Sequence, residues 1–147
     1  MKRAHSLEIY IASSAAKNFH AVQLLRRELR HMGHTVLDWT TLTPPLPDHL
    51  TPDVRKAALD SDECGEVFTF CTSACASADL VIYLGPAGQD ASCEVGIAFN
   101  AGVPVFGLAG LTEQPGVIMH RAVSKWFSSV RALLVGIEHL AEDMARA

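Results

Sequence analysis

The sequence predicts an α/β fold in which a parallel sheet lies between two layers of helices. Short apolar runs rich in β-branched residues alternate along the chain with segments whose apolar residues recur at helical spacing. The run DLVIYLG, residues 79–85, is apolar through its centre, as is typical of a strand covered on both faces. With right-handed crossovers, these elements give a flavodoxin-like, or Rossmann-like, three-layer sandwich whose five parallel strands have the order 2-1-3-4-5.

The first part of the chain supplies two strands and one helix. LEIYIA, residues 7–12, is expected to be the first strand. The segment 18–33 has apolar residues at helical spacing and stops at Gly33, which is a good signal for a helix end. TVLDW, residues 35–39, is expected to be the second strand. Residues 40–53 hold four of the seven prolines and are therefore expected to be irregular.

The second part continues the alternation of helices and strands. Two helices, around 52–60 and over 63–78, are expected to lead into the buried strand at 79–85. The remaining elements are expected to be a helix at 92–102, a strand at 103–109, an amphipathic segment at 115–124, a short strand at 125–129 and a closing helix from 130 to the C-terminus.

Composition limits the classes of function. A chain of 147 residues with 49% hydrophobic and 19% charged residues is expected to fold as one domain over 1–147. A net charge of -4 without a basic stripe argues against a nucleic-acid polymer as partner. The apolar run at 7–12 is too short to span a membrane. Four cysteines without CxxC spacing are expected to be buried thiols of a cytoplasmic protein, and the dispersed histidines predict no metal site.

Ligands of such sheets bind at the carboxyl ends of the strands, beside the point where the strand order reverses. One loop at this point is YIASSAAKN, residues 10–18, which lacks the glycines of GxGxxG, so no dinucleotide cofactor is expected. Ser13 and Ser14 precede a helix N-terminus, where backbone N–H groups favour an anion such as one phosphate. A helix-capping role for either serine is an equally open interpretation.

The other loop, residues 84–94, ends on a single acid, Glu94. A helix that begins near residues 90–92 would place Glu94 in its first turn, where the helix dipole keeps a carboxylate ionised. An ordinary N-terminal helix glutamate is the simplest interpretation. However, small residues allow close approach, and Val95, Ile97 and Phe99 are expected to bury this helix on the sheet. An ionised acid at the rim of such a cleft is suited to act as a nucleophile or base.

Three segments in this order carry a resemblance. IYIASSAAKN, LRHMGHTVLDW and SADLVIYLGPAGQDASCEVGIAFNAGVPVFGL resemble the nucleoside 2-deoxyribosyltransferase family, in particular its short bacterial members and the related nucleotide N-glycosidases. The sharpest part is E-x-G-x-A, which begins at Glu94. The resemblance implies that Glu94 attacks the anomeric carbon of a (deoxy)ribosyl group and expels the base. It implies that Tyr10 orients the nucleophile, that Ser14 binds a 5′-phosphate, and that the protein is a homo-oligomer, a dimer or tetramer.

The sequence departs from the family pattern at two places. Where family members commonly carry an aspartate on the helix before the third strand, this chain has Cys71, and a thiol is a poor substitute in protonating a leaving base. The loop before the glutamate reads GQDAS. Its candidate substrate-binding residues are Gly88, Asp90 and Ser92, although Asp90 could instead be the helix N-cap.

Three functions are compatible with these features. The leading hypothesis is cleavage or transfer of the N-glycosidic bond of a nucleoside or nucleoside 5′-monophosphate, with no metal and no cofactor. A non-catalytic nucleotide-binding or regulatory module of the same fold is the second hypothesis, and a glycohydrolase that cleaves NAD is the third.

Overall fold

The computed structural model describes residues 5–147, which contain a five-stranded parallel sheet of order β2-β1-β3-β4-β5. The predicted fold class and strand order are therefore confirmed. The strands are β1 (Glu8–Ser13), β2 (Thr35–Leu37), β3 (Leu80–Leu84), β4 (Val105–Leu108) and β5 (Lys125–Trp126). The last residues of three strands lie in register, because Ser13 is paired with Leu84, and Leu84 with Leu108. The segments that follow these strands therefore leave the sheet at the same edge.

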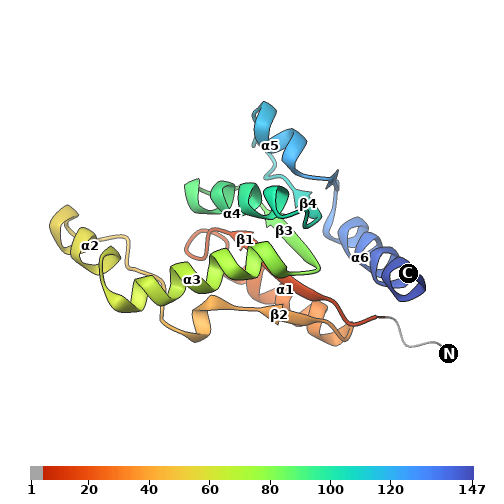
Figure 1. The fold of residues 1–147 in the computed structure, drawn as a ribbon. Helices are drawn as coiled ribbons and strands as arrows, with labels where there is room; N and C mark the ends of the chain where they lie inside the picture. The colour runs from red at the N-terminus through yellow and green to blue at the C-terminus, as the bar shows by residue number, and fades with distance from the viewer. Residues whose placement is uncertain (1–4) are drawn as a thin grey trace.

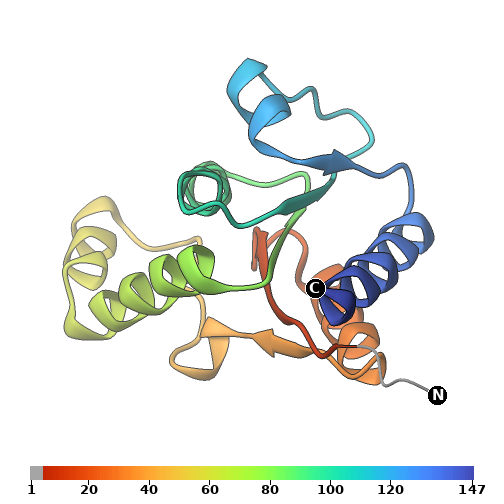
Figure 2. The ribbon, with the colours of Figure 1, turned by 45° about the vertical axis from the view of Figure 1, so that its right-hand side comes forward.

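Helices cover both faces of the sheet (Figures 1 and 2). One face packs against α1 (Phe19–His31) and α6 (Val130–Arg146). The other packs against α3 (Asp62–Ser77), α4 (Gln89–Asn100) and α5 (Val117–Ala122). The 3-10 helix η1 (Trp39–Thr41) and α2 (Pro52–Leu59) connect β2 to α3, and α2 extends away from the sheet in both views.

Alternation along β1 divides its side chains between the two layers. Ile9 and Ile11 join the core beneath α1 and α6. Tyr10 and Ala12 join the core beneath α3 and α4, because successive strand residues point to opposite faces. The tyrosine side chain therefore points toward the layer that contains α4.

The buried stripe of α4 differs from the one expected. Its buried residues are Ala91, Val95 and Ala98, at the three- and four-residue spacing of a helical face. The prediction that Val95, Ile97 and Phe99 bury this helix on the sheet holds for Val95 and in part for Ile97, which is half-buried against the same core, and is wrong for Phe99, which is 62% exposed. Each residue turns a helix by about 100°, so alternate residues point in nearly opposite directions.

Two expected element boundaries also shift. The strand expected at 35–39 ends at Leu37, because Asp38 accepts a hydrogen bond from the backbone N–H of Thr40 at 3.0 Å and caps η1. The Asp38 carboxylate also pairs with the buried Arg26 guanidinium at 2.9 Å. The helix expected at 92–102 begins three residues earlier, at Gln89, and this shift changes the environment of Glu94.

The prediction of four buried thiols is only half right. Cys71 and Cys75 lie on the buried face of α3, whereas Cys64 is partly exposed and Cys93 is exposed on α4. All four cysteines are free. In residues 5–147 no helix is long and apolar enough to cross a membrane.

Candidate active site

The structure brings Tyr10 and Glu94 together at the interface of β1 and α4. The Tyr10 hydroxyl donates a hydrogen bond of 2.7 Å to Oε1 of Glu94. Tyr10 is almost completely buried, whereas Glu94 is partly exposed. Within residues 5–147 no hydrogen bond reaches the second carboxylate oxygen, Oε2. One oxygen of Glu94 is therefore fixed by the tyrosine, and the other is free to contact a ligand.

Burial, not the helix dipole, dominates the ionisation of Glu94. Because α4 begins at Gln89, Glu94 lies in the second turn, and the expectation that the dipole keeps it ionised is not supported. Desolvation raises the pKa of Glu94 to about 7; the hydrogen bond from Tyr10 lowers it, and the negative charge of Asp90 raises it. A group with this pKa changes its charge near neutral pH, as is common for catalytic acids and bases.

The raised pKa predicts a stability cost at high pH. Between pH 4.5 and pH 7 the folded protein holds a proton on Glu94 that the unfolded chain has lost, so the free energy of unfolding falls as the pH rises through this window. Glu94→Gln, which stays neutral, is expected to be more stable than wild type at pH 8 by about 1–2 kcal/mol after solvent screening, and close to wild type at pH 4. Urea unfolding at the two pH values measures the difference. An equal difference at both would contradict the burial argument.

Tyr10 and Cys71, the tyrosine and the thiol beside Glu94, are neutral at pH 7. Burial raises the pKa of Tyr10 far above its ordinary value, and the charge of Glu94 adds to this effect, so the phenol remains a hydrogen-bond donor. Burial also raises the pKa of Cys71 to about 11, so that its sulfur carries a proton. Cys71 and Tyr10 lie close enough to influence the pKa of each other, and the charge of Glu94 raises the pKa of both. The position at which the sequence departs from the family pattern therefore lies inside the candidate site.

The two serines after β1 have different surroundings. Ser13 donates a hydrogen bond of 2.7 Å to the carbonyl of Leu84 and accepts one from the Asn18 amide at 3.0 Å. Ser14 accepts a hydrogen bond of 3.1 Å from the backbone N–H of Lys17. Neither serine caps α1, whose N-cap residue is Asn18. In the described chain the Ser14 hydroxyl donates to no protein group, and Ser14 is therefore the better placed of the two to donate to an anion.

The residues before Glu94 form the start of α4. Gly88 is the N-cap residue, so the alternative that Asp90 is the N-cap is wrong; Asp90 lies within the first turn. All three candidate residues, Gly88, Asp90 and Ser92, are exposed, and the Ser92 hydroxyl makes only a long contact of 3.4 Å to the Gly88 carbonyl. They lie on the same helix start as Glu94 and remain candidate ligand-binding residues.

Sequence reasoning missed three polar residues at this edge of the sheet. The Asn18 amide reaches the carbonyl of Pro86 at 2.7 Å, and the Tyr83 hydroxyl donates to Glu113 at 2.6 Å. The only signal in the sequence for Asn18 was its position at the expected helix start. Nothing in the local pattern around Glu113 distinguishes it from a surface acid, because two of its three partners, Ala87 and Tyr83, are 26 and 30 residues away.

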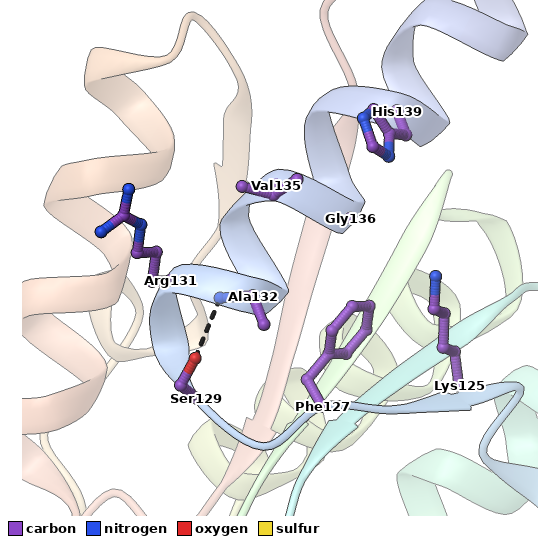
Figure 3. A pocket seen from close by; sticks show the side chains of 8 residues that line it. All are labelled: Lys125, Phe127, Ser129, Arg131, Ala132, Val135, Gly136 and His139. Carbon is purple, nitrogen blue, oxygen red and sulfur yellow. Dashed lines mark hydrogen bonds between the residues drawn. The ribbon is translucent and has the colours of Figure 1, made fainter.

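A separate hollow lies between β5 and α6 (Figure 3). It measures about 480 Å³ and has Lys125 and Phe127 on the strand side and Ser129 and His139 on the helix side. The Lys125 ammonium lies 5.2 Å from the centre of the Phe127 ring. The Ser129 hydroxyl accepts a hydrogen bond of 3.1 Å from the backbone N–H of Ala132 in the first turn of α6. This hollow contains none of the predicted site residues.

We place the candidate active site at Glu94, because its carboxyl group has a raised pKa and accepts a hydrogen bond from the buried Tyr10 hydroxyl.

Residues 5–147 contain no group of three or more His, Cys, Asp or Glu side chains arranged to hold a metal ion.

Comparisons with known proteins find similar structures but no similar sequences. No protein-family model matches the chain. No curated protein matches it either. The 2-deoxyribosyltransferase of Bacillus psychrosaccharolyticus superposes with a TM-score of 0.57 at 17% identity, covering 86% of this chain and 89% of that one. A CMP N-glycosidase of Clostridium botulinum gives 0.56 at 15% identity, covering 90% and 98%.

A conserved protein of Enterococcus faecalis gives a TM-score of 0.56 at 17% identity, with 91% of this chain and 98% of that one covered. At these identities the likeness establishes the fold. The activity has to be argued from the site.

Proposed function

We propose that this protein belongs to the nucleoside 2-deoxyribosyltransferase-like enzymes and cleaves or transfers the N-glycosidic bond of a nucleoside or nucleoside 5′-monophosphate. The hydrogen bond between Tyr10 and Glu94, on the strand β1 that lies beside β3 where the strand order reverses, is the observation that carries the proposal. Two of the proteins with a similar fold are named as a 2-deoxyribosyltransferase and a CMP N-glycosidase, and these names support the proposal.

The proposed reaction proceeds through two displacements at the anomeric carbon. Oε2 of the ionised Glu94 forms a bond to C1′ while the bond from C1′ to the base nitrogen breaks, and the base leaves with the electron pair and takes up a proton from solvent water. Water, or the nitrogen of a second base, then attacks C1′ and releases the carboxylate. Because each displacement inverts the configuration, the net result is retention.

Tyr10 has a positioning role in this scheme. Its hydroxyl binds Oε1 and leaves Oε2 as the attacking oxygen. The same hydrogen bond lowers the pKa of Glu94 and thus favours the ionised nucleophile. The phenol keeps its own proton at neutral pH, so it donates a hydrogen bond to the Glu94 carboxylate without ionising.

The segment after β1 is the proposed site of the 5′-end of the substrate. Ser14 has a hydroxyl proton free for an anion, and it lies in the turn that precedes α1. Gly88, Asp90 and Ser92 face solvent at the start of α4 and are proposed to contact the sugar or its phosphate. Ser13 is proposed to shape this segment through its bond to Leu84.

A substrate panel tests the proposal. The purified protein is incubated with nucleosides, their 5′-monophosphates and NAD, and the free base is measured by chromatography. We expect base release from at least one nucleoside or nucleoside monophosphate. Release of nicotinamide from NAD alone would replace the proposal by the glycohydrolase hypothesis, and no release from any compound would contradict it.

The buried thiol of Cys71 favours a second candidate function. A thiol with a pKa of about 11 is a much weaker acid than a carboxyl group and is a poor substitute for the family's aspartate in protonating the leaving base. A protein that kept the cleft and lost this acid would be a nucleotide-binding or regulatory module. Thermal stabilisation by a nucleoside monophosphate, with no base release over the same period, distinguishes this function from catalysis.

The pH dependence of the reaction follows from the ionisation of Glu94. Because the nucleophile must be ionised, kcat/KM is expected to rise with pH and to reach half its maximum at about pH 7. Asp90→Asn removes a negative charge that raises the pKa of Glu94, so the midpoint is expected to move to lower pH. Asp53→Asn, an exposed acid on α2, is the control and should not move it. A midpoint that Asp90→Asn leaves in place would contradict the assignment.

We further propose that the protein is a cytoplasmic homo-oligomer. The four cysteines form no disulfide with one another, which supports the compartment. Four large apolar side chains are exposed on α4, on α5 and in the segment between β4 and α5, which supports self-association. They are Phe99, Leu111, Val117 and Ile118. Light scattering is expected to give the mass of two or four chains, and the mass of one chain would contradict the proposal.

A further inference from the structure

A second carboxylate ties together two loops at the edge of the sheet where Glu94 lies. Glu113 belongs to the segment that follows β4. Its Oε2 accepts hydrogen bonds from the Tyr83 hydroxyl at 2.6 Å and from the backbone N–H of Ala87 at 3.3 Å. Its Oε1 accepts a hydrogen bond of 3.2 Å from the backbone N–H of Gly110. Both oxygens are occupied inside the protein, so Glu113 is not suited to bind substrate directly.

Two glycines allow these loops to touch. A Cβ on Gly85 would overlap the Glu113 carboxylate and lie 2.9 Å from the backbone nitrogen of Gly110. A Cβ on Gly110 would lie 2.7 Å from Cδ of Pro86. Real Cβ atoms do not approach other atoms so closely, so only glycine fits at both positions. The segment after β4 is therefore packed directly against residues 85–88, which we call the 85–88 loop.

The 85–88 loop is also held from the side of β1. The Asn18 side-chain amide donates to the carbonyl of Pro86 at 2.7 Å and to the Ser13 hydroxyl at 3.0 Å. Asn18 thus binds a carbonyl of the loop, while Glu113 binds an N–H of the next residue, Ala87. The loop is fixed from both neighbouring strands.

The 85–88 loop leads directly into the helix that carries the candidate nucleophile. Its last residue, Gly88, is the N-cap of α4, the helix that carries Glu94. We propose that Glu113 is a positioning residue that holds the 85–88 loop in the conformation that binds substrate. This role rests on the proposed function. Since the Tyr10–Glu94 hydrogen bond does not involve the loop, Glu113 is expected to act on substrate binding more than on the chemical step.

Kinetics of Glu113→Gln test this role. An amide replaces one acceptor oxygen by a donor, so it cannot satisfy all three N–H and O–H groups that Glu113 binds. We expect the KM for the substrate that wild type cleaves to rise at least fivefold while kcat stays within twofold. Tyr83→Phe, which removes one of the three hydrogen bonds, should shift KM in the same direction by less. Glu66→Gln, at an exposed acid on α3, should change neither constant.

An unchanged KM, or a fall in kcat at constant KM, would overturn the positioning role. If Glu113→Gln does not fold, Tyr83→Phe carries the same test, because it deletes a single hydroxyl.

Amide hydrogen exchange separates this inference from the proposed function. In Glu113→Gln, exchange is expected to be at least tenfold faster in peptides covering the 85–88 loop and unchanged in α6. If wild type cleaves nothing in the substrate panel, the proposed function fails, and this measurement still decides whether Glu113 holds the 85–88 loop in place. Unchanged exchange in the loop, or faster exchange throughout the protein, would overturn it.

Discussion

Glu94→Gln is expected to lower kcat/KM for base release by about 1000-fold or more. The amide keeps the size of the side chain and can still accept the hydrogen bond from Tyr10, but it has no anionic oxygen to attack C1′. Chromatography of the released base measures the loss directly.

The matched control is Glu66→Gln, which makes the same chemical change at an exposed position on α3 and should retain wild-type activity. Binding of the nucleotide should survive in Glu94→Gln, so a thermal shift by the substrate verifies that the variant is folded and still binds it. Base release by Glu94→Gln at the wild-type rate would rule out the nucleophile.

Tyr10→Phe is expected to lower kcat by about 10- to 100-fold, the range for losing one hydrogen bond to a charged group. It should also change the pH profile. The hydrogen bond from Tyr10 lowers the pKa of Glu94, so its removal raises that pKa and moves the rising limb of kcat/KM to higher pH.

Tyr83→Phe provides the comparison for this variant. Tyr83 is also a buried tyrosine that donates to a glutamate, at 2.6 Å, but its partner is Glu113. It is expected to act on KM and to leave the pH midpoint in place. A midpoint that does not move in Tyr10→Phe, or that moves to lower pH, would show that Tyr10 does not control the ionisation of Glu94.

The fold could be predicted because its signal is local. The apolar run at β3 and the alternation of strand and helix patterns predicted a parallel sheet. The right-handedness of crossover connections then limited the possible strand orders. The meeting of Tyr10 and Glu94, which are 84 residues apart, was expected only from the family resemblance. Strand alternation explains it, since Tyr10 points to the face that α4 covers.

The ionisation of Glu94 could not be predicted from the sequence. It depends on where α4 begins and on how deeply the carboxylate is covered, and Gly88 gave no strong signal as the N-cap. The helix starts one to three residues earlier than expected, so Glu94 lies beyond the first turn, and burial raises its pKa.

The contacts of Glu113 could not be predicted from the sequence either. They depend on the close packing of Gly85 and Gly110, which are brought together by the pairing of β3 with β4. A pair of glycines in two loops has no sequence pattern of its own, because glycine is also common in turns that touch nothing.

The most direct test of the central claim is detection of the sugar on the protein. Wild-type protein is mixed with the substrate found in the panel, quenched in acid within the first turnover, digested and analysed by mass spectrometry. The account predicts a (deoxy)ribosyl ester on the peptide that contains Glu94, and its absence from Glu94→Gln. An ester on another residue, or burst release of base with no adduct on any peptide, would contradict it.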